Sequence, residues 1–296
     1  MTVTTTVTEL RALLASDTPP ALLDVRWALG DPHGREHYAE GHIPGAVYVD
    51  LDTELASAPT QRGGRHPLPP IAELQENARR WGLRQGQPVV VHDDAGNTAA
   101  ARAWWLLRYA GIDRVTLLDG ALGAWRSAGL PLESGRPVAP PPGDVVLREG
   151  ALPVTDADGA AELAASGLLL DARAGERYRG EVEPVDPRAG HIPGAVSAPT
   201  GGNLAADGTF LPSDELRERF AELGADAARP GAARPGAARP GADSAPGIGV
   251  YCGSGVTAAH QIAALEIAGF RAALFPGSWS AWSADPDRPA AKGDRP

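Results

Sequence analysis

The chain contains the same pattern twice, and this duplication limits the folds that it can adopt. The stretch GHIPGAV at 41–47 recurs unchanged at 190–196. Three further pairs of blocks match in the same order: LLDVR with LLDAR, VVVHDDAGNTAAA with IGVYCGSGVTAAH, and LLDGALGAW with LFPGSWSAW. Blocks that repeat in one order predict two copies of a single domain.

The duplication sets the expected domain limits. A chain of 296 residues is long enough for two domains that each bury a core. We expect a first domain over 1–136, a Pro- and Gly-rich linker over 137–152, and a second domain over 153–296. Residues 227–241 are three copies of AARPG, a composition that resists packing, so a disordered insert is expected there.

Each half alternates short apolar runs with helical patterns, which predicts an α/β fold with a parallel sheet flanked by helices. In the first half we expect strands near 22–25, 47–49, 89–92 and 115–118, with helices at 7–15, 71–81 and 98–109. In the second half we expect strands near 168–171, 196–198, 249–252 and 272–275, with a helix from 257 onward. The tryptophans Trp125 and Trp282 match between the halves, which suggests core packing, and burial is also expected for Trp279.

Charge and composition exclude several classes of function. The formal net charge of −10 argues against general affinity for nucleic acids or anionic membranes. No apolar run has the length of a transmembrane helix, and the N-terminus lacks the features of a secretory signal. A single cysteine excludes an intramolecular disulfide, so we expect a cytoplasmic protein.

That single cysteine, Cys252, lies where a buried strand passes into a Gly-rich loop and then a helix. Such a loop directs backbone N–H groups and a helix N-terminus at the sulfur, and this field favours the thiolate anion. The sequence therefore predicts a nucleophilic cysteine. The first half has Asp93 at the matching position, so we expect that half to be inactive and structural.

Two other kinds of cysteine site are disfavoured by the same residues. A cysteine-loop phosphatase needs an arginine six positions after its cysteine, and Ala258 occupies that position. A lone cysteine without clustered histidines cannot supply a tetrahedral metal site, so no metal and no cofactor are expected.

HIPGA in both halves, together with Cys-Gly-Ser-Gly-Val-Thr in the second, resembles the tandem-domain rhodanese family of sulfurtransferases. The resemblance implies two rhodanese-like domains and a ping-pong reaction through a Cys252 persulfide. It implies 3-mercaptopyruvate or thiosulfate as the sulfur donor, and cyanide, a small thiol or thioredoxin as the acceptor. The loop residues Gly253, Gly255, Val256 and Thr257 would then hold the anionic substrate.

The resemblance also implies a proton relay of Ser254, His42 and Asp31. Each member has an alternative role: turn chemistry for Ser254, a structural role shared with His191 for His42, and solvation for Asp31. The neutral loop around Ser254 resembles mercaptopyruvate enzymes more than thiosulfate enzymes.

Arginines are the expected contacts of the donor's anionic group. Arg177 matches the family's arginine for this role, and a guanidinium suits a planar anion. Arg188 is a second candidate, although its distance from the following histidine departs from the family's spacing. The alternative to an enzyme is a sulfur carrier, or a regulatory rhodanese module that docks onto a protein partner; a carrier would load once and not turn over.

Overall fold

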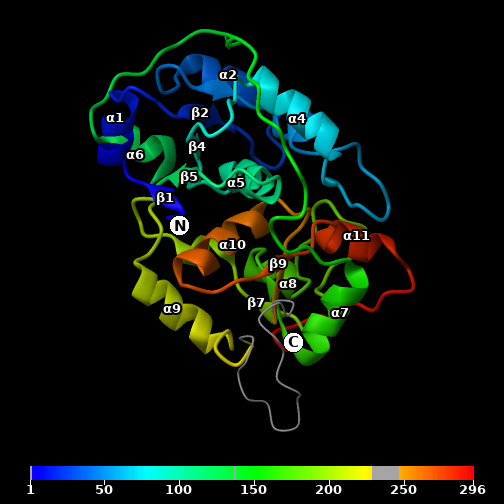
Figure 1. The fold of residues 1–296 in the computed structure, drawn as a ribbon. Helices are drawn as coiled ribbons and strands as arrows, with labels where there is room; N and C mark the ends of the chain where they lie inside the picture. Colours follow the sequence, from blue (N-terminus) through cyan, green and yellow to red (C-terminus); the bar gives the residue numbers. More distant parts are fainter. Residues whose placement is uncertain (1, 137, 229–246) are drawn as a thin grey trace. The chain divides into compact units, whose positions relative to one another are not determined.

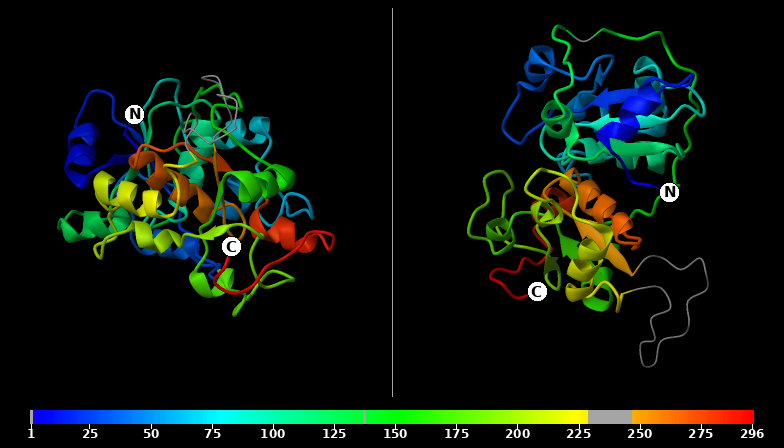
Figure 2. Two further views of the ribbon diagram at one scale, coloured as in Figure 1. Left: turned by 90° about the horizontal axis from the view of Figure 1, so that it is seen from below. Right: turned by 90° about the vertical axis from the view of Figure 1, so that its left-hand side faces the viewer.

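The computed structural model describes residues 2–136, 138–228 and 247–296 (Figures 1 and 2). Its contacts divide the chain into two compact units, and each unit contains one copy of the repeat. The first unit consists of Met1–Ala58, Leu68–Ala151 and Leu204–Phe210, and the second of Pro59–Pro67, Leu152–Asn203 and Leu211–Pro296. The short segment Pro59–Pro67 thus belongs to the second unit although it lies within the first half of the sequence.

The predicted insert at 227–241 lies outside the described residues from position 229 onward. Only its first two residues are described, and of these Ala228 is buried.

The first unit contains a parallel sheet with the strand order β1-β5-β4-β2-β3. Helix α1 begins with a capping box, in which the Thr6 hydroxyl accepts from the Glu9 N–H at 3.2 Å and the Glu9 carboxylate accepts from the Thr6 N–H at 2.8 Å. The elements of this unit are β1 (Thr4–Thr5), α1 (Val7–Leu14), β2 (Ala21–Asp24), α2 (Gly34–Glu40), β3 (Val47–Tyr48), α3 (Leu51–Glu54), α4 (Ile71–Arg80), β4 (Val89–His92), α5 (Ala100–Tyr109), β5 (Val115–Leu118) and α6 (Ala121–Ser127).

The second unit repeats this plan with the parallel strand order β7-β6-β8-β9. Val154 pairs with Leu274 in a parallel bridge and so occupies the place that β1 takes in the first sheet. The elements of this unit are α7 (Ala157–Ser166), β6 (Leu168–Asp171), α8 (Gly175–Tyr178), β7 (Val196–Ser197), the 3-10 helix η1 (Thr200–Asn203), α9 (Ser213–Glu222), β8 (Ile248–Tyr251), α10 (Thr257–Ile267), β9 (Ala273–Leu274) and α11 (Ser278–Ala284).

The predicted α/β class with two parallel sheets is confirmed, and every predicted strand is present. The edge strand β1 was not predicted, because two threonines carry too little periodicity to mark a strand. The central strands β4 and β8 are buried along their whole length, as expected for strands covered on both faces.

The two cores also repeat. In the first unit, Trp125 of α6 packs with Leu10 of α1 against one face of the sheet. In the second, Trp279 and Trp282 of α11 pack with Ala160 of α7 in the same way. The predicted burial of the three tryptophans is therefore confirmed.

Candidate active site

Cys252 directly follows β8, the strand that lies between β6 and β9. In a parallel sheet, this carboxyl end of a central strand is where substrates usually bind. The free thiol is buried, and its sulfur accepts the Gly255 N–H at 3.1 Å. Helix α10 begins at Thr257, after Val256, and no side chain caps its first turn. Its first N–H groups are therefore left for an acceptor in this loop.

Gly255 is the residue that allows the loop to close around the sulfur. Its φ of +79° lies in the left-handed region, and a Cβ there would lie 2.5 Å from the Pro276 carbonyl oxygen. A side chain at this position would therefore displace either Pro276 or the N–H that reaches Cys252.

Ser278 holds the backbone of Cys252 from the side of α11. Its hydroxyl accepts the Cys252 N–H at 3.1 Å and donates to the Phe275 carbonyl at 2.9 Å. Ser278 has a positive φ of 52°, and the matching residue of the first unit, Ala121, has 53° without a hydroxyl. This conformation is thus a feature of the repeated fold, to which Ser278 adds the hydroxyl that holds Cys252.

The loop of the first unit serves as an internal control for the cysteine loop. There the Asp93 carboxylate accepts four backbone N–H groups, from Ala95, Asn97, Ala99 and Ala100, at distances of 2.7–3.0 Å. Burial raises the pKa of Asp93, and the four donors act against that change. This loop of the repeat is thus built to surround an anion, and in the first unit its own side chain fills it.

The histidine that contacts Ser254 is His66, from the segment Pro59–Pro67. Its Nδ1 lies 2.7 Å from the Ser254 hydroxyl oxygen. The relay expected from the sequence pairs Ser254 with His42, a residue of the first unit, whereas this contact lies within the second unit. A signal was present in the repeat: residues 62–66 read RGGRH, whereas the corresponding segment before α9, 200–212, contains no arginine or histidine.

His42 instead supports the fold of the first unit. Its Nδ1 lies 2.9 Å from the Tyr38 carbonyl, and its ring stacks on the Tyr38 ring with centroids 3.8 Å apart. His191 makes the same contacts with Tyr178 in the second unit, at 2.8 Å and 3.8 Å. The two HIPGA histidines therefore share one structural role, the alternative that the repeat had suggested.

Asp31 lies in the first unit and pairs with His37 at 2.9 Å. The His33 backbone N–H and the His37 ring lower the pKa of Asp31, and the hydrogen bond that His37 donates to Asp31 raises the pKa of His37. Both side chains line a cavity of about 150 Å³. These contacts engage Asp31 with His37 inside the first unit, and its predicted part in a relay stays a prediction.

Arg177, the arginine expected to contact the donor, lies beside the cysteine loop, and a second arginine joins it. A Cβ at Gly253 would lie 3.1 Å from Nη2 of Arg65 and 3.3 Å from Nη1 of Arg177. Arg65 precedes His66 and was missed by the sequence analysis. The loop that follows Cys252 is thus flanked by two cations.

Arg188, the second arginine expected to contact the donor, binds backbone carbonyls of its own unit. Its guanidinium donates to four backbone carbonyls at and beyond the end of α11, those of Trp282, Ser283, Asp285 and Arg288, at 2.6–3.0 Å. These carbonyls are left without partners where a helix ends, so the arginine closes that end. These contacts differ from the donor-binding role expected for Arg188, and that role stays a prediction.

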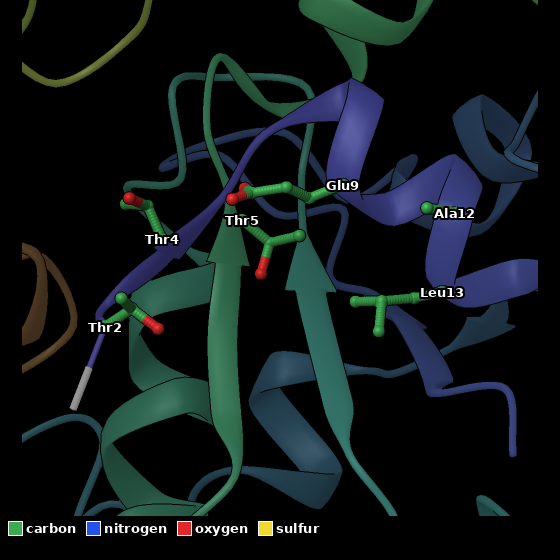
Figure 3. Close-up of a pocket in the computed structure, with 6 residues that line it drawn as sticks. All are labelled: Thr2, Thr4, Thr5, Glu9, Ala12 and Leu13. Atoms are coloured by element: carbon green, nitrogen blue, oxygen red, sulfur yellow. The ribbon is translucent and has the colours of Figure 1, made fainter. Parts of the chain in front are cut away.

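A larger cavity of the first unit has no cysteine, histidine or cationic side chain among its lining residues. It has a volume of about 440 Å³, and Figure 3 shows the residues that line it beside β1 and α1: Thr2, Thr4, Thr5, Glu9, Ala12 and Leu13. Its one carboxylate, Glu9, is engaged in the cap of α1. Over 2–136, 138–228 and 247–296, no His, Cys, Asp and Glu side chains form a group of three or more able to hold a metal ion. No helix within these ranges has the length and apolar character needed to cross a membrane.

Comparison with known proteins gives the family. The Rhodanese-like domain matches the chain twice, at residues 6–128 and 156–285. The protein named "Putative thiosulfate sulfurtransferase SseB" of Mycobacterium tuberculosis is 46% identical over 291 residues, which are 97% of this chain and 96% of that protein. The "Probable 3-mercaptopyruvate sulfurtransferase" of Pseudomonas aeruginosa is 47% identical over 295 residues, 98% of each.

Solved structures agree with the sequence comparisons. The 3-mercaptopyruvate sulfurtransferase of Leishmania major superposes with a TM-score of 0.77 at 28% identity, over 94% of this chain and 73% of that one. The SseA structure of Escherichia coli, described as a 3-mercaptopyruvate sulfotransferase, superposes with a TM-score of 0.74 at 29% identity, over 95% and 100%.

A duplicated parallel-sheet domain with a cysteine loop in one copy defines a tandem-domain rhodanese. The chain belongs to this family and is a sulfurtransferase, which confirms the family and enzyme class predicted from the sequence.

Proposed function

We propose that the second unit transfers a sulfane sulfur from a small donor to an acceptor through a persulfide on Cys252. The observation that carries this proposal is the cysteine loop itself, in which the Gly255 N–H reaches the sulfur at 3.1 Å. The Asp93 loop supports it, because the same backbone surrounds an anion when the side chain is a carboxylate. An anionic persulfide at Cys252 would be stabilised by the equivalent donors.

The first half-reaction forms the persulfide. The Cys252 thiolate attacks the donor's outer sulfur, and the bond between that sulfur and the rest of the donor breaks. The bonding electrons leave with sulfite when the donor is thiosulfate, or with the enolate of pyruvate when it is 3-mercaptopyruvate. The enolate needs a proton, which the hydrogen-bonded pair of His66 and Ser254 is placed to deliver.

The second half-reaction regenerates the thiolate. Cyanide attacks the outer sulfur of the persulfide and leaves as thiocyanate, or an external thiol takes that sulfur. Cys252 is the only cysteine of the chain, so no internal thiol competes. Thioredoxin or a small thiol then serves as a cellular acceptor, and the predicted cytoplasmic location stays a prediction.

We also propose that the first domain of the predicted division, 1–136, has no sulfur-transfer chemistry of its own. Asp93 occupies the nucleophile's position and already satisfies the backbone donors of its loop. The enzyme would therefore carry one persulfide per chain.

Two variants test this mechanism in steady-state sulfur transfer to cyanide. Cys252→Ser removes the nucleophile and abolishes transfer. His66→Gln removes the proton source, so it slows turnover of 3-mercaptopyruvate more than that of thiosulfate, because sulfite leaves without needing a proton. Sustained turnover in the wild type excludes the carrier alternative, which predicts a single loading. Activity retained in Cys252→Ser would contradict the proposal.

A further inference from the structure

Arg65 and Arg177 converge on one point beside the nucleophile. The point is the position of a Cβ on Gly253, which lies 3.1 Å from Nη2 of Arg65 and 3.3 Å from Nη1 of Arg177. Gly253 has no side chain, so this point is open to a substrate atom. A donor that reaches Cys252 therefore meets two guanidinium groups.

The backbone fixes Arg65 at this place. Gly64 and Thr60 exchange two backbone hydrogen bonds, at 2.8 Å and 3.1 Å, and close a tight loop. The Arg65 N–H donates to the Ser280 hydroxyl of α11 at 3.1 Å. Gly64 has a φ of +77° and would place a Cβ 2.5 Å from the Gly277 carbonyl oxygen, so only glycine permits this approach.

Two buried carboxylates hold the arginines. Asp186 pairs with both Arg65 and Arg177, the latter at 3.2 Å, and Glu183 pairs with Arg177 at 2.7 Å. The carboxylate side chains are only 3% and 4% exposed. Glu183 also pairs with Arg173 at 3.5 Å, and Arg173 pairs with Asp171 at 2.6 Å, so three cations and three anions balance to zero net charge. Without Arg65 this group would carry a net charge of −1 beside the cysteine loop.

One donor of this group is still unused. The Nε of Arg177 is buried and has no hydrogen-bond partner among the residues that the structure describes. A buried guanidinium N–H without a partner is unfavourable, and an anionic oxygen would satisfy it. The arrangement is thus incomplete without an anion.

We propose that Arg65 is a donor-selecting residue, which acts with Arg177 on the anionic end of the donor and favours thiosulfate over 3-mercaptopyruvate. This inference rests on the proposed sulfur transfer. Thiosulfate is a dianion, whereas 3-mercaptopyruvate with a protonated thiol carries one negative charge. Because electrostatic attraction scales with the ligand's charge, removal of the Arg65 charge weakens binding of the dianion more.

Arg65→Gln in the full chain tests this proposal with thiosulfate and 3-mercaptopyruvate as donors and cyanide as acceptor. Loss of one charge-assisted contact predicts a fall in kcat/KM for thiosulfate of roughly tenfold to hundredfold, and a clearly smaller fall for 3-mercaptopyruvate. Arg65→Lys, which keeps the charge, retains most of the preference of the wild type.

The matched control is Arg179→Gln, since Arg179 is a more exposed arginine of the same unit that pairs with Glu181. We expect Arg179→Gln to leave kcat/KM unchanged for both thiosulfate and 3-mercaptopyruvate. Equal losses for both donors in Arg65→Gln, or equal effects of Gln and Lys, would overturn the inference. Mass spectrometry of the wild type with donor alone separates the two proposals. Absence of an added sulfur on Cys252 would refute the sulfur-transfer mechanism. A normal persulfide, together with an unchanged ratio of kcat/KM for the two donors in Arg65→Gln, would refute only the proposed role of Arg65.

Discussion

The duplicated loop allows a paired test of Gly255, with Gly96 of the first unit as its internal control. Both glycines have positive φ, +79° and +68°. Alanine in the left-handed region costs about 1–2 kcal/mol at either position. At Gly255 the new Cβ also meets the Pro276 carbonyl at 2.5 Å, and the required backbone shift adds about 1–3 kcal/mol. At Gly96 it meets the end of the Leu204 side chain at 2.7 Å, which can rotate away.

We therefore expect Gly255→Ala to lower the free energy of unfolding by about 2–5 kcal/mol and Gly96→Ala by about 1–2 kcal/mol. Activity separates the pair further, because only Gly255 donates its N–H to the Cys252 sulfur. Loss of a hydrogen bond to a charged group, about 1.5–3 kcal/mol, reduces kcat/KM roughly tenfold to hundredfold. Urea unfolding and steady-state sulfur transfer measure the two effects. If Gly255→Ala were as active as Gly96→Ala, the loop N–H would have no part in catalysis.

Three further variants test the surroundings of the site. Ser278→Ala leaves the buried Cys252 N–H without its acceptor and lowers the free energy of unfolding by about 1–3 kcal/mol, and an unchanged urea midpoint would contradict this. The His37 pKa, followed by NMR, lies above its ordinary value and returns toward it in Asp31→Asn. The stabilisation from this pair is present between the pKa values of the two groups; it is lost as the pH rises through the raised pKa of His37 and as it falls through the lowered pKa of Asp31. Arg188→Met lowers the thermal midpoint and leaves the ratio of kcat/KM for the two donors unchanged, whereas an altered ratio would restore Arg188 as a donor contact.

The fold was predictable because the duplication and the local periodicity are both visible in the amino-acid sequence. HIPGA, the strand before Cys252 and the helix after it are local patterns, and each appears where expected. These features depend on neighbouring residues, which is the information that a single sequence carries best. Arg177 was instead expected from the family resemblance; it lies beside Gly253, and its role toward the donor stays a prediction.

His66 and Arg65 were missed because their segment has no periodicity and its partners are far away in the sequence. The contact of His66 with Ser254 spans 188 positions. A Pro- and Gly-rich loop within the first half gave no sign that Pro59–Pro67 belongs to the second unit. His42 was chosen instead because it stands in a conspicuous motif, whose role is to pack against Tyr38. The contacts of Arg188 could not be predicted for a similar reason, since the sequence does not show where the carbonyls beyond α11 lie.

Sulfur transfer by this chain requires that Cys252 carries the sulfur. Intact-protein mass spectrometry after incubation with donor and no acceptor, followed by peptide mapping, detects this sulfur. We expect a mass increase of one sulfur atom per chain, on the peptide that contains Cys252, which disappears when cyanide is added. A protein that turns over donor and acceptor without any sulfur on that peptide would contradict it.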